Sequence, residues 1–462
     1  MNRTCSVAGL AVIAAMCLTA GSLGGNVHAQ APAQAPAQGQ QDANAPKQQY
    51  TIAEYNAYQA CSAEKNPTAQ IKCLDDFVAK YPNSQLLIYV YPLYYNAYSQ
   101  SKNFKKVIEY ADKLLALGAE KVEAPVRYQA YYARAFAYSN LDPKDPDVAA
   151  QAPKACEAAR AGLKTLGELK KPDNMSEEDF NKQKQQPTIL FSYTLASCSM
   201  VQKDYQTAID AYKAVLAANP DDAITSYKIG QAYMAMNPPQ QMDGFWYFAK
   251  AATAKNANPQ QANQVKTYLR KLIANYQGGN VCDSLVDAEL NELLQLASTS
   301  AERPASYKLA SAADLDAARK DMTIASVIAD LRAGGDKAKI TWLAACGLEF
   351  PDVPGKLIEV TPAGSDVQLK VAFVTSDAEF DAKNTPDMDV KVVGQPEAAG
   401  LQKNNPVRFT GTLVAYDPDP NFMLHWDKAK VNAEDIPKEK EKKEKKAPTK
   451  KRPTKKPGRS QP

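Results

Sequence analysis

Apolar residues between Ile189 and Pro220 recur every three or four positions, as they do on one face of an α-helix. They form two stripes, the first made of Leu195, Ala196 and Ser199 and the second of Ala208, Tyr212 and Val215. Small residues let two helix backbones approach where they cross, and larger residues fill the space where the helices diverge. The segment therefore predicts two short antiparallel helices, the second of which ends before Pro220.

The same spacing returns in neighbouring windows. From Ala223 onward, corresponding places are held by Ile229, Gly230 and Tyr233, and then by Gly244, Phe248 and Ala251. Weaker copies begin before Tyr94 and near Tyr131, and the second helix of the latter is expected at about 153–166. Between the copies, residues 171–186 are polar and predict a surface loop with a short helix over 176–184, which Ser176 and Asp179 would cap.

This pattern resembles the tetratricopeptide repeat (TPR), over about residues 50–300. The resemblance implies an α-solenoid of antiparallel helix pairs that starts near Thr51 and is capped by amphipathic stretches up to Tyr276 and from Ser284 to Ala297. A helix pair cannot bury its own apolar face, so about three or more pairs must stack for stability. Families of this kind bind proteins or peptides and are not catalysts.

The resemblance also implies where a partner would bind. In such repeats the first helix of each pair lines an inner groove, and its fifth place often contacts the ligand. That place is held by Tyr132, Tyr193 and Tyr227 in three units and by Pro92 in another. With Ser197 and Gln231, the three tyrosines form the candidate partner-binding groove. The alternative, that the tyrosines pack between repeats, stays open.

After a helical connector at 301–345, with a helix expected over 314–331, the apolar period changes from 3.6 to 2. Alternating or β-rich runs occur at 356–360, 367–374, 389–393, 407–416 and 422–426. Five short strands separated by Pro, Gly and Asp predict a small β domain at 346–436 that resembles an OB-type barrel, with Gly411 at a bend or bulge. Barrels of this type often bind nucleic acid or sugar on aromatic side chains. Tyr416, Phe422 and Trp426 could serve in that way, but aromatic residues at strand spacing are more often core residues.

The two ends of the chain differ from the rest in composition. Residues 1–29 combine Arg3, an uncharged apolar run and Val27-His28-Ala29, which predicts a signal peptide cleaved after Ala29 and a periplasmic or secreted protein. Residues 30–49 are rich in Ala, Pro and Gln and predict a disordered linker. The tail at 437–462 holds twelve Lys or Arg and three Glu, so it predicts a disordered basic segment that either attracts an anionic surface or only aids solubility.

Six cysteines remain after the predicted cleavage: Cys61, Cys73, Cys156, Cys198, Cys282 and Cys346. An even set at wide spacing in an exported chain favours three disulfides, with buried free thiols as the alternative. Neighbouring helices would bring Cys61 to Cys73 and Cys156 to Cys198, which leaves Cys282 for Cys346. Six cysteines allow 15 pairings, so the sequence does not fix the connectivity.

Residues typical of catalysis are scarce. After the predicted cleavage His425 is the only histidine, and the sequence contains no Gly-rich phosphate loop, HExxH or GxSxG motif. We therefore expect no enzyme activity, no metal and no cofactor. Two functions remain: a scaffold that binds a protein or peptide in the repeat array, and an envelope-polymer binder that holds polysaccharide or nucleic acid through the barrel and basic tail. Truncation after about Leu309 would separate them. The partner and the oligomeric state are not encoded in any motif.

Overall fold

The computed structural model describes residues 50–437, which form two compact units. The first contains the described residues up to Leu272 together with Glu289–Leu309, and the second contains Ile273–Ala288 and the residues from Ala310 onward. Each unit is treated by itself below. The predicted signal peptide, the linker at 30–49 and the basic tail from residue 438 lie outside the described residues, so their predictions stay predictions.

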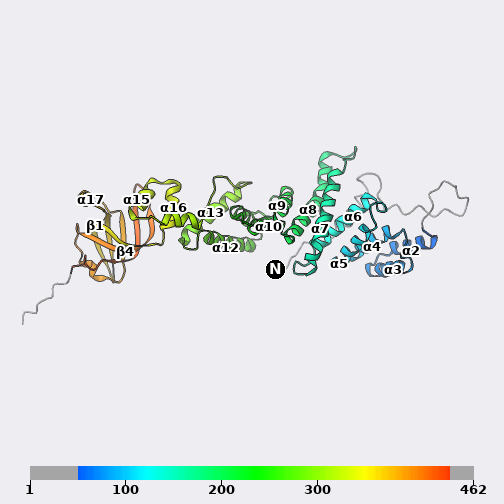
Figure 1. Ribbon diagram of the computed structural model, residues 1–462, viewed down its shortest axis with the longest axis horizontal. Coiled ribbons are helices and arrows are strands. Elements are labelled where there is room, and N and C mark those ends of the chain that lie inside the picture. Colours follow the sequence, from blue (N-terminus) through cyan, green and yellow to red (C-terminus); the bar gives the residue numbers. More distant parts are fainter. Residues whose placement is uncertain (1–49, 438–462) are drawn as a thin grey trace, which may run out of the picture. The chain divides into compact units, whose positions relative to one another are not determined.

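The first unit is a series of antiparallel helices (Figure 1). They are α2 (Ile52–Ala63), α3 (Pro67–Lys80), α4 (Leu87–Gln100), α5 (Phe104–Leu115), α6 (Ala124–Ser139), α7 (Asp147–Glu168), α8 (Glu177–Val201), α9 (Tyr205–Ala218), α10 (Ala223–Ala235) and α11 (Gln241–Thr253). The unit boundary passes through α12 (Pro259–Tyr276) and α13 (Asp283–Thr299). The predicted solenoid of helix pairs is confirmed as a fold.

Local sequence signals fix the first helix ends. Thr51 caps α2 in a capping box with Glu54, because its hydroxyl accepts from the Glu54 amide while the Glu54 carboxylate accepts from the Thr51 amide. Asn66 caps α3 by accepting from the amides of Thr68 and Ala69 at 3.0 and 3.1 Å. Pro67 is the first residue of that helix, where its missing N–H costs no hydrogen bond.

Two of the turns between paired helices share one backbone conformation. Lys102, between α4 and α5, has φ 55°, and Lys203, between α8 and α9, has φ 61°. The next residue caps the second helix in each case, Asn103 for α5 and Asp204 for α9. The amides of these capping residues donate to Tyr98 O and Ser199 O respectively, both at 2.9 Å. The match supports the internal repetition that the apolar spacing predicts.

The predicted loop at 171–186 is wrong in extent. Helix α8 runs without a break from Glu177 to Val201, with Ser176 as its cap as expected and Pro187 inside it. Helix α7 also begins earlier than expected and contains Pro153. The two helices extend beyond their neighbours (Figure 1). The added turns of α8 bury Phe180, and burial of this apolar side chain stabilises the helix in a way that a polar loop would not.

Three short helices precede the barrel in the second unit: α14 (Ala312–Arg319), α15 (Ile324–Ala333) and α16 (Gly335–Ala345). The single helix expected over 314–331 is therefore wrong. The chain leaves helical geometry after Lys320, and Thr323 starts α15 with a capping box in which its hydroxyl accepts from the Ser326 amide at 3.1 Å. Helix α16 lies within the helical connector predicted at 301–345, although its bounds were not predicted.

The strands form a closed five-stranded barrel in the order β1-β2-β3-β5-β4, with β4 paired back to β1. They are β1 (Glu349–Ala363), β2 (Asp366–Phe373), β3 (Met388–Val392), β4 (Pro406–Asp417) and β5 (Met423–Val431). All pairs are antiparallel except β3 with β5. Helix α17 (Asp377–Ala382) lies between β2 and β3, and the 3-10 helix η2 (Pro396–Gly400) between β3 and β4. This arrangement confirms the expected OB-like barrel.

Strands β1 and β5 are longer than the predicted runs at 356–360 and 422–426. The sequence prediction for β1 began at Lys356 because Pro351, Pro354 and Gly355 discourage strand assignment, but the strand absorbs them with a register shift between Phe350 and Val353. The predicted bulge at Gly411 is confirmed by a register shift between Thr410 and Thr412. A Cβ on Gly411 would lie 3.2 Å from the Cβ of Ala429, so glycine also permits close approach of β5.

Candidate partner-binding face of the first helices

The three candidate tyrosines occupy corresponding places on α6, α8 and α10, and each is half-buried. Each ring rests on another aromatic ring: Tyr132 on Phe191 with centroids 6.0 Å apart, Tyr193 on Tyr212 at 5.7 Å, and Tyr227 on Phe248 at 5.2 Å. Such ring contacts fix the tyrosines in one orientation while part of each ring stays accessible. The tyrosines thus pack within the array and also reach its surface.

Ser197 and Gln231 lie one turn further along the same helices. The Ser197 hydroxyl is 3.2 Å from the Tyr212 hydroxyl, so Ser197 and Tyr193 both contact the side chain of Tyr212. Gln231 is exposed on α10, one turn beyond Tyr227. Pro92 lies within α4 and is half-buried. Tyr193 and Ser197 therefore lie one turn apart on α8, and Tyr227 and Gln231 lie one turn apart on α10.

Polar contacts join the first helices α6 and α8 directly. The Thr194 hydroxyl donates to the backbone oxygen of Ala135 at 3.2 Å and lies 2.8 Å from the Ser139 hydroxyl. Thr194 is fully buried, so these bonds satisfy a hydroxyl that would otherwise be costly to enclose. Sequence reasoning missed Thr194, because one threonine among apolar positions carries no distinctive signal.

Sequence reasoning also missed two apolar residues near Tyr227. Ile224, on the first turn of α10, is 59% exposed, and Tyr268 of α12 is 42% exposed. The Tyr268 ring meets Phe248 edge-on at 5.4 Å, on the same ring that supports Tyr227. Burial raises the pKa of the Tyr227 hydroxyl, and the nearby Tyr268 adds to this effect. Ile224, Tyr227 and Tyr268 give this end of the first unit an accessible apolar character.

Behind the face, α6 carries a buried cation. Arg134 is 1% exposed, and its guanidinium bonds to Asp112 of α5 and, at 2.9 Å, to Gln151 of α7. Burial lowers the pKa of Arg134 by penalising its charge, while Asp112 acts in the opposite direction. These partners belong to three successive helices, so the ion pair holds two helix pairs in register.

The six cysteines form three disulfides, Cys61–Cys73, Cys156–Cys198 and Cys282–Cys346. The first joins α2 to α3, the second joins α7 to α8, and the third joins the segment before α13 to the end of α16 within the second unit. Three bridges indicate a chain that folds in an oxidising, extracellular-type compartment.

The aromatic residues of the barrel point mainly into its core. Trp426 is 2% and Phe422 6% exposed, and the Trp426 ring packs edge-on against Phe350 and Phe409. Tyr416 is half-buried, with its ring 4.9 Å from that of Trp342 of α16. The expectation that these aromatic residues are core residues is confirmed for Trp426 and Phe422, which are therefore not available as a stacking platform.

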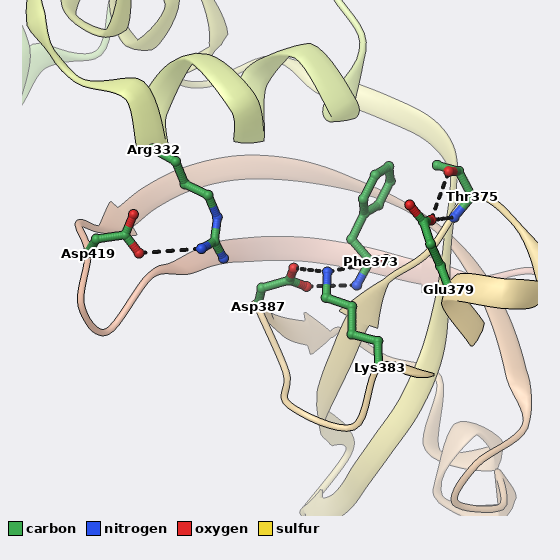
Figure 2. Close-up of polar contacts among 7 residues, drawn as sticks. All are labelled: Arg332, Phe373, Thr375, Glu379, Lys383, Asp387 and Asp419. Carbon is green, nitrogen blue, oxygen red and sulfur yellow. Dashed lines mark hydrogen bonds and ion pairs between the residues drawn. The ribbon is translucent and has the colours of Figure 1, made fainter. Parts of the chain in front are cut away.

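Ion pairs and hydrogen bonds pin the loops around the barrel (Figure 2). Arg332 of α15 reaches the β4–β5 loop, where it pairs with Asp419 at 3.4 Å and lies 4.2 Å from the Phe422 ring centre. Buried Asp387 accepts from the Phe373 amide at 2.7 Å and pairs with Lys383. Each charge drawn has a partner within the unit, so these contacts are explained by loop anchoring.

Glu379 anchors the start of α17 in the same view (Figure 2). Its carboxylate accepts from the Thr375 amide at 2.7 Å and from the Thr375 hydroxyl at 2.9 Å. The hydrogen bond from the Thr375 amide is the main reason why the pKa of Glu379 lies below its ordinary value.

His425 lies on β5 between two carboxylates. Its Nε2 is 2.9 Å from Asp417 of β4, and its Nδ1 is 3.5 Å from Asp389 of β3, which also pairs with Lys370 of β2 at 3.1 Å. The four residues form a ladder across adjacent strands, a structural role for this half-buried histidine. Across residues 50–437, no group of three or more His, Cys, Asp or Glu is arranged to hold a metal ion.

Comparison of the chain with family models, curated proteins and solved structures gives no significant match. Among the described helices, none is long and apolar enough to cross a membrane.

Proposed function

We propose that this chain is an exported, non-catalytic binding protein whose first helices hold a peptide or protein segment. The proposal rests on the position of three tyrosines, Tyr132, Tyr193 and Tyr227, which occupy corresponding places on three first helices. Each tyrosine ring packs against another aromatic ring and stays partly accessible. Tyrosines of this kind contribute contact area at low entropic cost and are enriched where binding energy is concentrated.

The repeat spacing supports the same proposal. The resemblance to tetratricopeptide repeats implies that first helices line the inner surface, and the helix pairing agrees with that spacing. The signal-like residues 1–29 and the three disulfides support export to the periplasm or the cell exterior. The inward position of Trp426 and Phe422 disfavours the polymer-binding alternative, since it leaves only Tyr416 of the three candidate aromatic residues partly accessible.

The test uses the full-length protein. Truncation after Leu309 would remove Cys346 and leave Cys282 unpaired, so loss of binding by that truncation would be ambiguous. Tyr193→Ala with Tyr227→Ala should weaken capture of envelope partners by at least tenfold with little change in melting temperature. Tyr205→Ala, a half-buried tyrosine at the start of the second helix α9, is the matched control. A large fall in melting temperature with unchanged capture would contradict the proposal.

A further inference from the structure

One line of positions along the first helices is accessible throughout. The first place of each repeat is Ile88 on α4, Tyr128 on α6, Ile189 on α8 and Ala223 on α10. Counted from there, the side chains at the second, fifth, ninth and thirteenth places are all half-buried or exposed. The third, eighth and tenth places are all buried. A spacing of three and then four residues lies along one side of a helix, so these places form one stripe on each helix. We call the four stripes together the first-helix strip.

The first-helix strip contains no charged side chain. Its members are aromatic, aliphatic, amide or hydroxyl residues, in a chain whose overall content of charged residues is 23%. The contrast with the second helices is sharp, because the exposed side chains of α7 include Lys154, Glu157, Arg160 and Lys164. Charged side chains are thus exposed on the second helix α7 and absent from the accessible stripe of the first helices.

A helix face that only meets water has no reason to avoid charge, because charged side chains are the commonest exposed residues. The first-helix strip instead leaves Ile224 59% and Val201 40% exposed. Exposed apolar side chains grouped on one face are typical of surfaces that another chain covers. A solvent-exposed face does not explain this composition, whereas an uncharged partner does.

We propose that the first-helix strip binds an extended polypeptide segment that carries no charged side chains at the contact. The proposal rests on the proposed function and adds the class of ligand. Tyr193 and Tyr227 offer ring faces and edges to aliphatic or proline side chains, a common mode for extended peptides. The amides of Asn96 and Gln231, at ninth places, supply donors and acceptors for the ligand backbone.

The cost of removing water from a charged group explains why the strip should prefer an uncharged segment to a charged one. A charged ligand side chain would lose water on contact with the strip and would find no opposite charge among the strip residues. An uncharged segment avoids that cost.

The test compares three pools of random peptides of about twelve residues with full-length protein. One pool contains only Ala, Pro, Leu, Gln, Ser and Tyr, and in the others a third of the residues are Glu or Lys. We expect at least tenfold greater retention of the uncharged pool, with retention unchanged between low and high salt, since screening weakens only charge-dependent binding. Greater or equal retention of either charged pool, or retention of none, would overturn the proposal.

A charge introduced into the strip should reverse the preference. Ser197→Glu with Gln231→Glu places two carboxylates on the strip and should lower retention of the uncharged pool and raise retention of the Lys pool. Arg160→Glu, which changes charge on α7 outside the strip, should leave both unchanged. If Tyr193→Ala with Tyr227→Ala abolishes partner capture while the pools show no preference, only this inference fails. If that variant keeps full partner capture, the proposed function itself fails.

Discussion

Lys102 and Lys203 hold the same left-handed backbone conformation in corresponding turns, although they lie in different helix pairs. Residues with side chains rarely adopt positive φ, and the energetic cost is largest for β-branched side chains. The side chains at these positions are therefore less important than the backbone geometry that places Asn103 and Asp204 as helix caps.

Substitutions at Lys203 should follow backbone preference. We expect Lys203→Asn to leave the free energy of unfolding nearly unchanged, because asparagine tolerates this conformation. Lys203→Val should lower it by about 1–2 kcal/mol. Denaturant unfolding of the two variants measures the difference. Equal stability of the two variants would show that the turn relaxes to negative φ.

Two glycines of α7 offer a matched pair. A Cβ on Gly162 would lie 2.3 Å from ring atoms of Phe191, whereas a Cβ on Gly167 would meet no atom within 4 Å. Gly162→Ala should therefore destabilise the protein by about 1–3 kcal/mol through overpacking. Gly167→Ala should stabilise it by up to about 1 kcal/mol through helix propensity. Thermal unfolding decides, and a neutral Gly162→Ala would mean that α7 and α8 separate without cost.

The pair Arg134–Asp112 should matter more than surface ion pairs. Asp112→Ala leaves a buried guanidinium without its carboxylate partner, so we expect a loss of about 3 kcal/mol in the free energy of unfolding. Glu168→Ala, which breaks the exposed contact with Lys164, is the control and should have no measurable effect. A similar result for both variants would indicate that Gln151 alone satisfies Arg134.

Alkaline pH should destabilise the helical unit through buried tyrosines. Burial raises the pKa of Tyr138 to about 12 from its ordinary value of 10.0. The unfolded chain then loses its proton first as pH rises, so stability present below pH 10 is progressively lost up to about pH 12. Tyr138→Phe removes this ionisation and should make the protein more stable than wild type at pH 11. Urea unfolding at pH 8 and pH 11 tests it, and an unchanged difference between the proteins would refute it.

The basic tail gives a test of surface attraction. Deletion of the residues after Pro437 removes twelve Lys or Arg and three Glu. If the tail attracts anionic surfaces, the full chain should bind anionic vesicles and release them as salt rises, because counterions screen the interaction over roughly 8 Å at physiological ionic strength. The shortened chain should bind neither anionic nor zwitterionic vesicles. Equal vesicle binding by both chains would leave the tail a solubilising role.

Much of the fold could be predicted because strong local signals agree with tertiary packing. Asn66-Pro67 marks a helix start that packing preserves, and Gly411 marks a bulge in the strand where it was expected. The predictions failed where packing overrides a local signal. Pro187 lies inside α8, although proline usually interrupts a helix. The break before Thr323 was missed because its capping partner is Ser326, a weaker signal than Glu or Gln.

The candidate site was only partly accessible to sequence reasoning. Repeat spacing located Tyr132, Tyr193 and Tyr227, but it could not reveal that each rests on a ring from a neighbouring helix. The exposure of Ile224 and Tyr268 also depends on which helices cover them. By contrast, the lack of charge along the first-helix strip is written in the sequence and becomes meaningful once accessibility is known.

The bridge Cys282–Cys346 has a consequence for a chain exposed to proteases. Any single cut between these two cysteines, for example near Glu302, would divide the polypeptide but leave both fragments covalently joined. A nicked molecule would migrate at full size on a non-reducing gel and separate into two fragments only after reduction. Backbone damage in this stretch would thus leave the helical array and the barrel together as one particle.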